Sequence, residues 1–474
     1  MDTIPLDPSQ AGSYEALFRF LQGCQARAAE RSHPQLVSIA AEAGALDPLA
    51  VLESIYEENE PHFYTERRSE NLAIAGAEDA VRFAPTGPRR FAEVKEWIAD
   101  TLEHTIAVGD DSLPFFGPCF FSAFSFFADV EQSEPFPSSS VFVPRWQVAV
   151  KKGRCVAIAN ALVEPESDVA AEATRIWNAN TKFRSFDYAD SEQRRARPRL
   201  DVIETSECGG DAIFKQSVSK AVEAIKRGDF RKIVLARALD LTANQAFHPL
   251  EILNTLRERY PDCYAFSYAN GRGESFIGAS PERLVSVEDA VVKVDALAGT
   301  APRGRSASED AQLGNQLLHS EKDLREHAIV FESIRRRLQQ LGISAPESCR
   351  PYLKKLQNVQ HLHVDIEAKK RSGIHMLDIV EALHPTPAVG GTPREVAVAS
   401  IRDFETFPRG LYAGPIGWVN AQGEGEFLVA IRSAQVSGKQ ARLYAGVGVV
   451  DGSEPEREYQ ETNLKFQALK ENLL

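Results

Sequence analysis

Two pairs of carboxylates with the same three-residue spacing are the first candidates for chemistry in this sequence. Glu458 and Glu461 lie near the C-terminus, after Ser453, which suits the N-cap of a helix, and Asp323 and Glu326 lie far upstream. Residues three apart project from one face of a helix. Two such pairs on two helices would offer the oxygen ligands that a hard cation such as Mg2+ prefers.

The acidic pairs also have a simpler interpretation. The positive end of the helix dipole favours acidic residues at helix N-termini, and acids are common in the first turn of a helix. Spacing alone therefore leaves a metal site and ordinary helix stabilisation both open.

The composition is that of a globular protein with ample material for a core. The chain has 474 residues, of which 43% are hydrophobic and 26% are charged. Its formal net charge of -13 argues against a nucleic-acid partner. An anionic ligand would have to find a local positive site, because the overall field repels it.

The cysteines and the apolar segments predict a reduced, cytoplasmic protein. The six cysteines are scattered without a CxxC pair, and the first residues lack the basic and apolar parts of a signal peptide. The most apolar run, 113–127, is too short to cross a bilayer and contains Gly and Pro. It is expected to form a buried strand and turn, and no membrane partner is expected.

The pattern of apolar residues predicts many strands and fewer helices. Helices are expected over 1–60, 162–182, 211–227, 309–341, 374–383 and 455–471. Strands are expected within 62–160 and at 232–237, 263–268, 275–279, 426–431 and 442–446. The polar, basic stretch 180–201 is expected to be an exposed connection. Many strands without regular βαβ alternation indicate an α+β architecture with large antiparallel sheets.

Nine segments match one family, most of them in the C-terminal half. They are Lys232-Ile-Val-Leu-Ala-Arg237, Gly278-Ala-Ser-Pro-Glu-Arg283, Ala298-Gly-Thr-Ala-Pro-Arg-Gly304, Lys322-Asp-Leu-Arg-Glu-His327, Val359-Gln-His-Leu362, His384-Pro-Thr-Pro-Ala-Val-Gly-Gly391, Tyr412-Ala-Gly-Pro-Ile-Gly417, Ala430-Ile-Arg432 and Tyr444-Ala-Gly-Val-Gly448 with the acidic helix after it. With these segments the sequence resembles the chorismate-utilising enzymes, which include isochorismate synthase, salicylate synthase, and component I of anthranilate synthase and of aminodeoxychorismate synthase. The resemblance implies a fold like that of anthranilate synthase component I, an α+β fold built as one large α/β sandwich of two similar halves.

The resemblance is uneven along the chain. It is specific over 210–474, the expected chorismate-binding catalytic region. It is weak over 1–200, which is expected to be the N-terminal part of the same sandwich. The two parts are expected to form one integrated structural unit.

Two residues distinguish the chemistries within the family. The resemblance makes Lys232 the base that activates water for attack at C2 of chorismate, and Glu282 the acid that protonates the departing C4 hydroxyl. The aminating enzymes have other residues in place of Lys232, and Ala298 stands where aminodeoxychorismate synthases often carry a reactive Lys. The expected activity is Mg2+-dependent isochorismate synthase, an isomerase, with no obligatory amidotransferase subunit. Salicylate synthase, which shares both residues, is the alternative, followed by anthranilate synthase component I.

The resemblance also assigns the residues that bind the substrate and the metal. One carboxylate of chorismate would lie on Mg2+ held by Glu326 and Glu461, with Glu458 and Asp323 close by or acting through water. The expected substrate-binding residues are Gly299, Thr300, His361, Tyr412, Arg432, Gly446 and Lys465. The 384–391 segment and the long N-terminal part look more like the isochorismate synthases of menaquinone or phylloquinone pathways, and siderophore use stays open.

Overall fold

The computed structural model describes residues 1–4, 13–184, 200–357 and 359–473. The basic run 194–199 of the predicted connection lies outside the described residues. The helices are α1 (Tyr14–Arg31), α2 (Pro48–Ser54), α3 (Arg90–Glu103), α4 (Val169–Arg184), α6 (Gly210–Arg227), α7 (Pro249–Arg259), α8 (Ala307–His319), α9 (Glu321–Gln340), α10 (Met376–Leu383), α11 (Arg394–Phe404) and α12 (Pro455–Leu473), with a short 3-10 turn at Arg68–Glu70.

The strands outnumber the helices in the described part of the chain. They are β1 (Asp2–Ile4), β2 (Gln35–Ala43), β3 (Pro61–Arg67), β4 (Leu72–Phe83), β5 (Thr105–Val108), β6 (Cys119–Phe124), β7 (Ser139–Lys151), β8 (Arg154–Val163), β9 (Val202–Glu207), β10 (Lys232–Ala243), β11 (Tyr264–Asn270), β12 (Glu274–Ser280), β13 (Arg283–Glu288), β14 (Val291–Pro302), β15 (Tyr352–Lys355), β16 (Val359–Lys369), β17 (Gly391–Thr392), β18 (Pro415–Asn420), β19 (Gly425–Val429), β20 (Ser433–Ser437) and β21 (Gln440–Val449).

Hydrogen bonds join these strands into one continuous antiparallel path. The order is β9-β10-β21-β20-β12-β11-β3-β4-β7-β6-β18-β19-β13-β14-β16-β15. A branch from β7 continues through β8, β2, β5 and β1, and here β5 pairs in parallel with β2 and with β1. The predicted α+β fold with extensive antiparallel sheets is confirmed.

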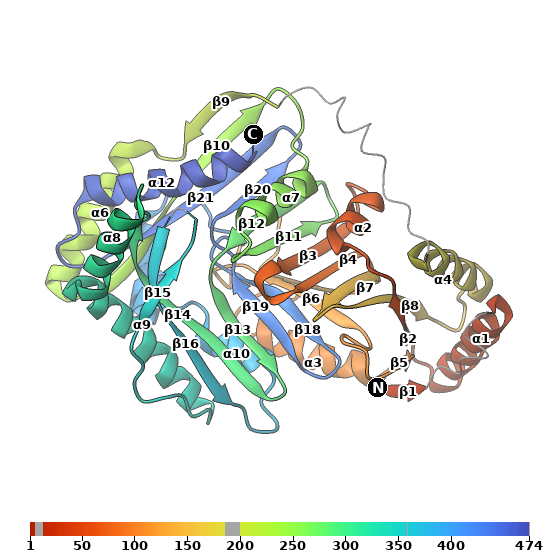
Figure 1. Ribbon diagram of the computed structural model, residues 1–474. Helices are drawn as coiled ribbons and strands as arrows, with labels where there is room; N and C mark the ends of the chain where they lie inside the picture. The colour runs from red at the N-terminus through yellow and green to blue at the C-terminus, as the bar shows by residue number, and fades with distance from the viewer. Residues whose placement is uncertain (5–12, 185–199, 358, 474) are drawn as a thin grey trace.

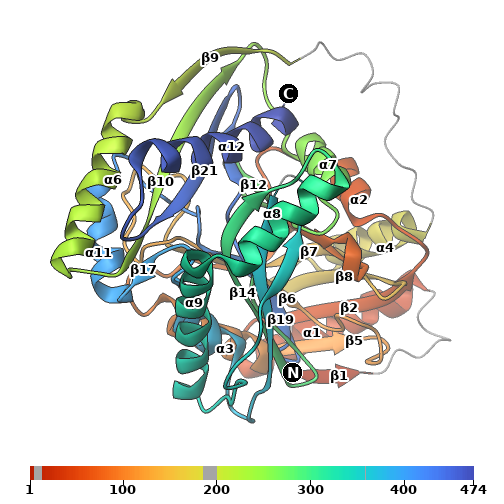
Figure 2. The same ribbon diagram turned by 60° about the vertical axis from the view of Figure 1, so that its left-hand side comes forward.

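Strands from the N-terminal 200 residues pair directly with strands from the rest of the chain. β3 pairs with β11, and β6 pairs with β18. Figure 1 shows helices α6, α8, α9 and α12 at one end of the molecule and helices α1 and α4 at the other. In Figure 2, α12 runs across β10 and β21, close to α6.

Aromatic side chains from several strands pack together in the core. Phe63 on β3 stacks on Phe121 of β6 with ring centroids 4.4 Å apart, and Phe121 meets the edge of Phe142 on β7. All three rings are fully buried. The apolar run 113–127 therefore lies in the core, with β6 at its centre, as predicted from its composition.

Three local predictions were wrong in instructive ways. The expected helix over 1–60 is interrupted by β2, which is buried on both faces between β5 and β8 and so lacks the alternation of a half-buried strand. The expected helix 309–341 is two helices, because Ser320 has an extended backbone and caps α9 through its hydroxyl. Ser453 is not the N-cap of α12. It lies two residues before the helix and accepts a hydrogen bond from the Val450 amide.

No helix among the described residues is long and apolar enough to cross a membrane.

Candidate active site

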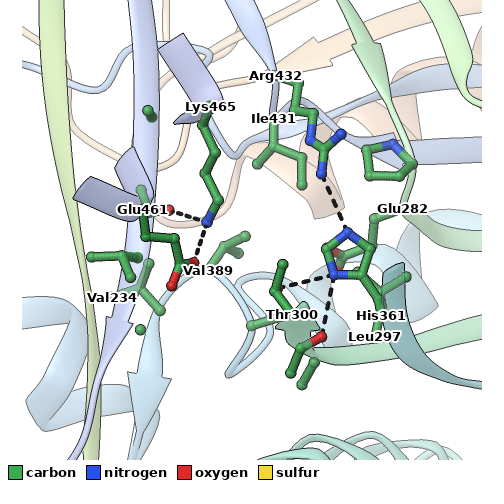
Figure 3. Close-up of a pocket in the computed structure, with 18 of the residues that line it drawn as sticks. Val234, Glu282, Leu297, Thr300, His361, Val389, Ile431, Arg432, Glu461 and Lys465 are labelled. Atoms are coloured by element: carbon green, nitrogen blue, oxygen red, sulfur yellow. Dashed lines mark hydrogen bonds and ion pairs between the residues drawn. The ribbon is translucent and has the colours of Figure 1, made fainter. Parts of the chain in front are cut away.

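One pocket gathers eleven of the thirteen residues predicted for the site. It lies where β10 and β21 face β14 and β16, and α9 and α12 also contribute side chains. Figure 3 shows Lys465 and Glu461 on one side of this pocket and Arg432, His361 and Thr300 on the other. The predicted residues that line it are Lys232, Glu282, Gly299, Thr300, Glu326, His361, Tyr412, Arg432, Gly446, Glu461 and Lys465.

Lys232 is the first residue of β10, and its side chain is buried at the pocket. Its Nζ donates a hydrogen bond of 2.7 Å to Oε1 of Glu326 on α9. The adjacent strand β21 has Gly448 at this level, and a Cβ atom there would lie 3.0 Å from Lys232 Cε. Glycine at 448 therefore leaves the room that the lysine side chain needs.

The ion pair determines the charge of Glu326. Burial alone would raise the pKa of this carboxyl, but the Lys232 ammonium attracts the carboxylate and donates to it, so the pKa lies below its ordinary value. Glu326 is consequently ionised at neutral pH.

Glu282 lies between β12 and β13 and is almost fully buried. Burial, together with the negative charge of Asp295, raises the pKa of Glu282 to about 8, although Lys354 and Lys232 act in the opposite direction. The group is therefore largely protonated at neutral pH. A buried, protonated carboxyl group at a pocket wall is suited to donate a proton to a leaving group.

His361 connects Arg432 to the Gly299–Thr300 segment on one side of the pocket. Burial and the nearby charge of Arg432 hold the pKa of His361 well below its ordinary value, so the ring is neutral. Its Nε2 lies 3.2 Å from Arg432 Nη2, and its Nδ1 lies 3.2 Å from the Gly299 carbonyl and 3.0 Å from Thr300 Oγ1. Since the guanidinium can only donate, these contacts assign the ring proton to Nδ1.

Arg432 presents a cation that lacks an acidic partner. Its backbone is in the left-handed region, with φ of 51°, and its carbonyl accepts a hydrogen bond from the Ala279 amide. Within the described part of the chain, no carboxylate lies within 4.0 Å of the guanidinium, whose side-chain hydrogen-bond partner is His361. Burial lowers the pKa of Arg432, yet an arginine stays charged at neutral pH. An anion bound in the pocket would supply the missing partner.

Lys465 and Glu461 form the opposite wall. Lys465 Nζ donates to the Gly446 carbonyl and to Glu461 Oε1, both at 2.8 Å. A Cβ atom at Gly446 would lie 2.6 Å from the Tyr412 hydroxyl, so this position has no space for a side chain. The Tyr412 ring stacks on Tyr444, with centroids 5.1 Å apart, which fixes the hydroxyl at the pocket.

The other two predicted metal ligands do not line this pocket. Asp323 accepts a hydrogen bond from the Ser320 hydroxyl at the start of α9. Glu458 is buried one turn before Glu461, and burial, aided by the charge of Glu461, raises the pKa of Glu458 against the effect of a hydrogen bond from Ser453.

The donors present at the pocket fit Mg2+. Glu326 and Glu461 provide carboxylate oxygens from two different helices, which is the ligand chemistry that this ion prefers. Each of these carboxylates now neutralises a lysine, Lys232 and Lys465 respectively. A cation bound here would therefore share these two carboxylates with the ammonium groups, each of which contacts one of the two oxygens, Oε1.

Sequence reasoning missed the apolar wall and a charged pair behind Glu282. Leu297, Val389 and Ile431 line the pocket beside the polar groups (Figure 3). Asp295 and Lys354 lie behind it, on β14 and β15. The signal for Val389 and Ile431 was available, since both lie inside or next to segments that match the family. No local pattern marks the pair, because the pairing of β15 with β16 brings it together.

Comparison with known proteins agrees with this site. A family model described as chorismate binding enzyme matches residues 20–474. The chain is 35% identical to the salicylate biosynthesis isochorismate synthase of Pseudomonas aeruginosa, covering 95% of this chain and 92% of the relative. It is 32% identical to the isochorismate synthase MenF of Bacillus subtilis, covering 94% of each.

A solved structure shares the whole fold. The menaquinone-specific isochorismate synthase MenF of Escherichia coli superposes with a TM-score of 0.77 at 25% identity, over 96% of this chain and 100% of the other. This match and the family model span both the weakly and the strongly matching parts of the sequence. The chain belongs to the family of chorismate binding enzymes.

Proposed function

We propose that the protein is an isochorismate synthase, which converts chorismate to isochorismate by adding water at C2 and releasing the C4 hydroxyl. One observation carries the proposal: Lys232 and Glu282, a base and an acid in this reaction, are both buried at the walls of a single pocket. The two relatives at 35% and 32% identity, each covered over most of its length, bear the same name and support it.

The pocket residues account for every proton in the reaction. Neutral Lys232 takes a proton from water, the water oxygen bonds to C2, the ring double bonds shift, and the C4–O bond breaks. Glu282 gives its proton to the departing oxygen, which leaves as water, so substrate and product are isomers. Lys232 has then gained the one proton that Glu282 has lost, and exchange with solvent restores both groups before the next turnover. Glu326 accepts the hydrogen bond that holds the Lys232 amine at the wall of the pocket.

The remaining residues hold the two carboxylates of the substrate. Arg432 can bind one of them bidentately, and neutral His361 holds the guanidinium in place. The second carboxylate would meet the Gly299–Thr300 backbone near Glu326 and Glu461. Lys465 and Tyr412 complete the enclosure.

Mg2+ belongs to this proposal as the ion at Glu326 and Glu461. When bound, it would neutralise and orient a substrate carboxylate. Glu458 and Asp323 would act behind it, through water or through the neighbouring acids. No amidotransferase subunit is needed, because water is the nucleophile.

A product assay tests the proposal. The purified protein is incubated with chorismate and Mg2+ in the absence of ammonia and glutamine, and the product is identified by chromatography. Isochorismate is expected. Salicylate with pyruvate would assign the alternative activity, salicylate synthase, and a product that forms only when ammonia is added would overturn both assignments.

The Lys232→Ala variant tests the role of the base in the same assay. The loss of a positioned general base is expected to lower kcat by about 100-fold to 10,000-fold. Circular dichroism checks that the variant is folded. A folded variant with wild-type activity would refute the assignment of Lys232.

A further inference from the structure

The peptide that carries Glu282 lies at a break in the sheet. β12 ends at Ser280 and β13 begins at Arg283, so Pro281 and Glu282 belong to neither strand. The register between β13 and β19 shifts just after Arg283. Proline has no amide hydrogen to donate. Glu282 itself keeps its backbone partners, since its amide donates to Ser280 Oγ and its carbonyl accepts from the Val429 amide, while Pro281 has no amide hydrogen to offer.

Asp295 and Lys354 bind the backbone on either side of Glu282. Lys354 Nζ donates to the Pro281 carbonyl at 2.8 Å and to Asp295 Oδ2 at 3.2 Å. The same Asp295 oxygen accepts a hydrogen bond of 3.3 Å from the Arg283 amide. One buried ion pair thus grips the residue before Glu282 and the residue after it.

The pair is itself held rigidly. Asp295 is 1% exposed at its side chain and Lys354 is 13% exposed. His363 Nε2 lies 3.5 Å from Asp295 Oδ1, and Arg283 Nη1 lies 3.9 Å from the same oxygen. Arg283 is anchored in turn by Glu426 at 3.1 Å. This network would remain to neutralise Asp295 if Lys354 were replaced.

We propose that Asp295 and Lys354 are positioning residues that hold the proton donor Glu282 against the substrate. The proposal rests on the proposed function, in which Glu282 protonates the leaving hydroxyl. Neither residue lines the pocket, so both act through Glu282 and not on the substrate.

The two charges act on Glu282 with opposite signs. The Asp295 carboxylate disfavours a second negative charge and raises the pKa of Glu282, whereas the Lys354 ammonium lowers it. Among the described residues, Lys232 lowers the pKa of Glu282 as well, and Tyr412 and His361 lie at the same pocket; none of these three changes in the variants below. A residue that merely supported the fold would not move this pKa in a sign-specific way.

Two variants separate these effects. Asp295→Asn and Lys354→Met should each lower kcat by about 10-fold to 100-fold through misplacement of the donor, with KM changed by less than about threefold. Asp295→Asn should move the fall of activity at high pH to lower pH, and Lys354→Met should move it to higher pH. Lys354→Arg, which keeps the charge and the donors, should restore kcat to within about threefold of wild type.

Lys293→Met is the matched control. Lys293 is a lysine on β14 whose ion pair of 2.9 Å joins it to Glu367 on β16, on an exposed part of the same strands. Its replacement should change neither kcat nor the pH profile. If Asp295→Asn and Lys354→Met keep wild-type kcat, or lower it without opposite shifts in pH, the proposal is overturned.

A titration without substrate keeps this test separate from that of the reaction. The carboxyl group of Glu282 is followed by infrared difference spectroscopy against pH, and the Glu282→Gln variant identifies its band. If the wild-type protein makes no isochorismate, but the Glu282 pKa shifts in opposite directions in Asp295→Asn and Lys354→Met, the proposed function is refuted and the role of the positioning pair is supported. If the wild-type enzyme makes isochorismate, but neither replacement shifts the titration of the Glu282 band, the proposed function is supported and the role of the positioning pair is refuted.

Discussion

Two glutamates at the same pocket have opposite charge states. Glu326 accepts a hydrogen bond from the Lys232 ammonium, and its pKa is held below its ordinary value despite burial. Glu282 is enclosed without such a donor, and burial with the Asp295 charge raises its pKa to about 8. The same residue type therefore serves as an anion on one wall and as a neutral acid on the other, because the surroundings differ.

The backbone creates this difference. Glu326 projects from the second turn of α9 toward the start of β10, so it meets Lys232 across the pocket. Glu282 sits at the gap between β12 and β13, beside Pro281 and facing apolar lining such as Leu297. Exchange of the roles would require exchange of the elements that carry the two side chains.

The Glu282→Gln variant is the strongest test of the contrast between Glu282 and Glu326. Loss of the proton donor should lower kcat by about 100-fold to 10,000-fold at neutral pH. In the wild type, activity should fall as the pH rises through about 8, because Glu282 must be protonated to act. Glu288→Gln, a half-buried acid at the end of β13 that pairs with Lys151 and Lys152 away from the pocket, serves as the control and should be indistinguishable from wild type in kcat and pH profile. A wild-type profile that stays flat up to pH 9 would contradict the neutral state of Glu282.

The same variant should be more stable than the wild type at neutral pH. The folded-state pKa of Glu282, about 8, exceeds its ordinary value of 4.5, so the stability that its protonated form contributes is complete below about pH 4.5. That stability is lost progressively as the pH rises to about 8. At pH 7 the free energy of unfolding of Glu282→Gln should exceed that of the wild type by about 3 kcal/mol. This value follows because pH 7 lies roughly 2.5 units above 4.5 and each unit contributes about 1.4 kcal/mol.

Urea unfolding without added divalent cation measures this gain. The difference between Glu282→Gln and wild type should be close to zero near pH 4.5 and largest near pH 8. A difference that is the same at pH 5 and pH 7 would show that burial does not hold Glu282 neutral.

Local signals in the sequence were enough for much of the fold and the pocket. The amphipathic helix expected over 211–227 is α6, and the strand expected at Lys232 begins there as β10. The helix has a helical period and ends at Gly228, whereas β10 opens as a continuous apolar run that is buried along its first seven residues. β2 was missed because a strand buried on both faces has no period-2 pattern.

What the sequence could not supply is contact between distant segments. The Lys232–Glu326 ion pair joins residues 94 positions apart, and Lys354 meets Asp295 across 59 positions. Such pairs depend on strand order and on helix placement, which no local spacing encodes. Apart from Glu326 and Glu461, which their spacing marked, the pocket residues were reachable through their family motifs, and the supporting pair behind them lies outside those motifs.

The two cations of the pocket extend the comparison between its acids. Lys232 has a carboxylate partner, whereas Arg432 has none within the described residues. Arg432→Lys keeps the charge but loses the planar fork, and kcat/KM for chorismate should fall about fiftyfold, mainly through KM. Arg402→Lys, an exposed arginine paired with Asp129, is the matched control. Unchanged KM in Arg432→Lys would mean that the guanidinium binds no substrate carboxylate.

The smallest predicted effect concerns the acid behind Glu461. Glu458 is buried without lining the pocket, and it senses the charge of Glu461. If Glu461 holds Mg2+, a neutral Glu458→Gln should raise the Mg2+ concentration for half-maximal activity by about tenfold, as for groups that support a metal ligand. Glu461→Gln should raise it further, and Glu456→Gln, an exposed acid on the first turn of α12, should not raise it. If activity survives chelation by EDTA, these acids serve only to stabilise the start of their helix. The different charge states of Glu326 and Glu282 would then be due to the Lys232 ion pair, with no contribution from a metal.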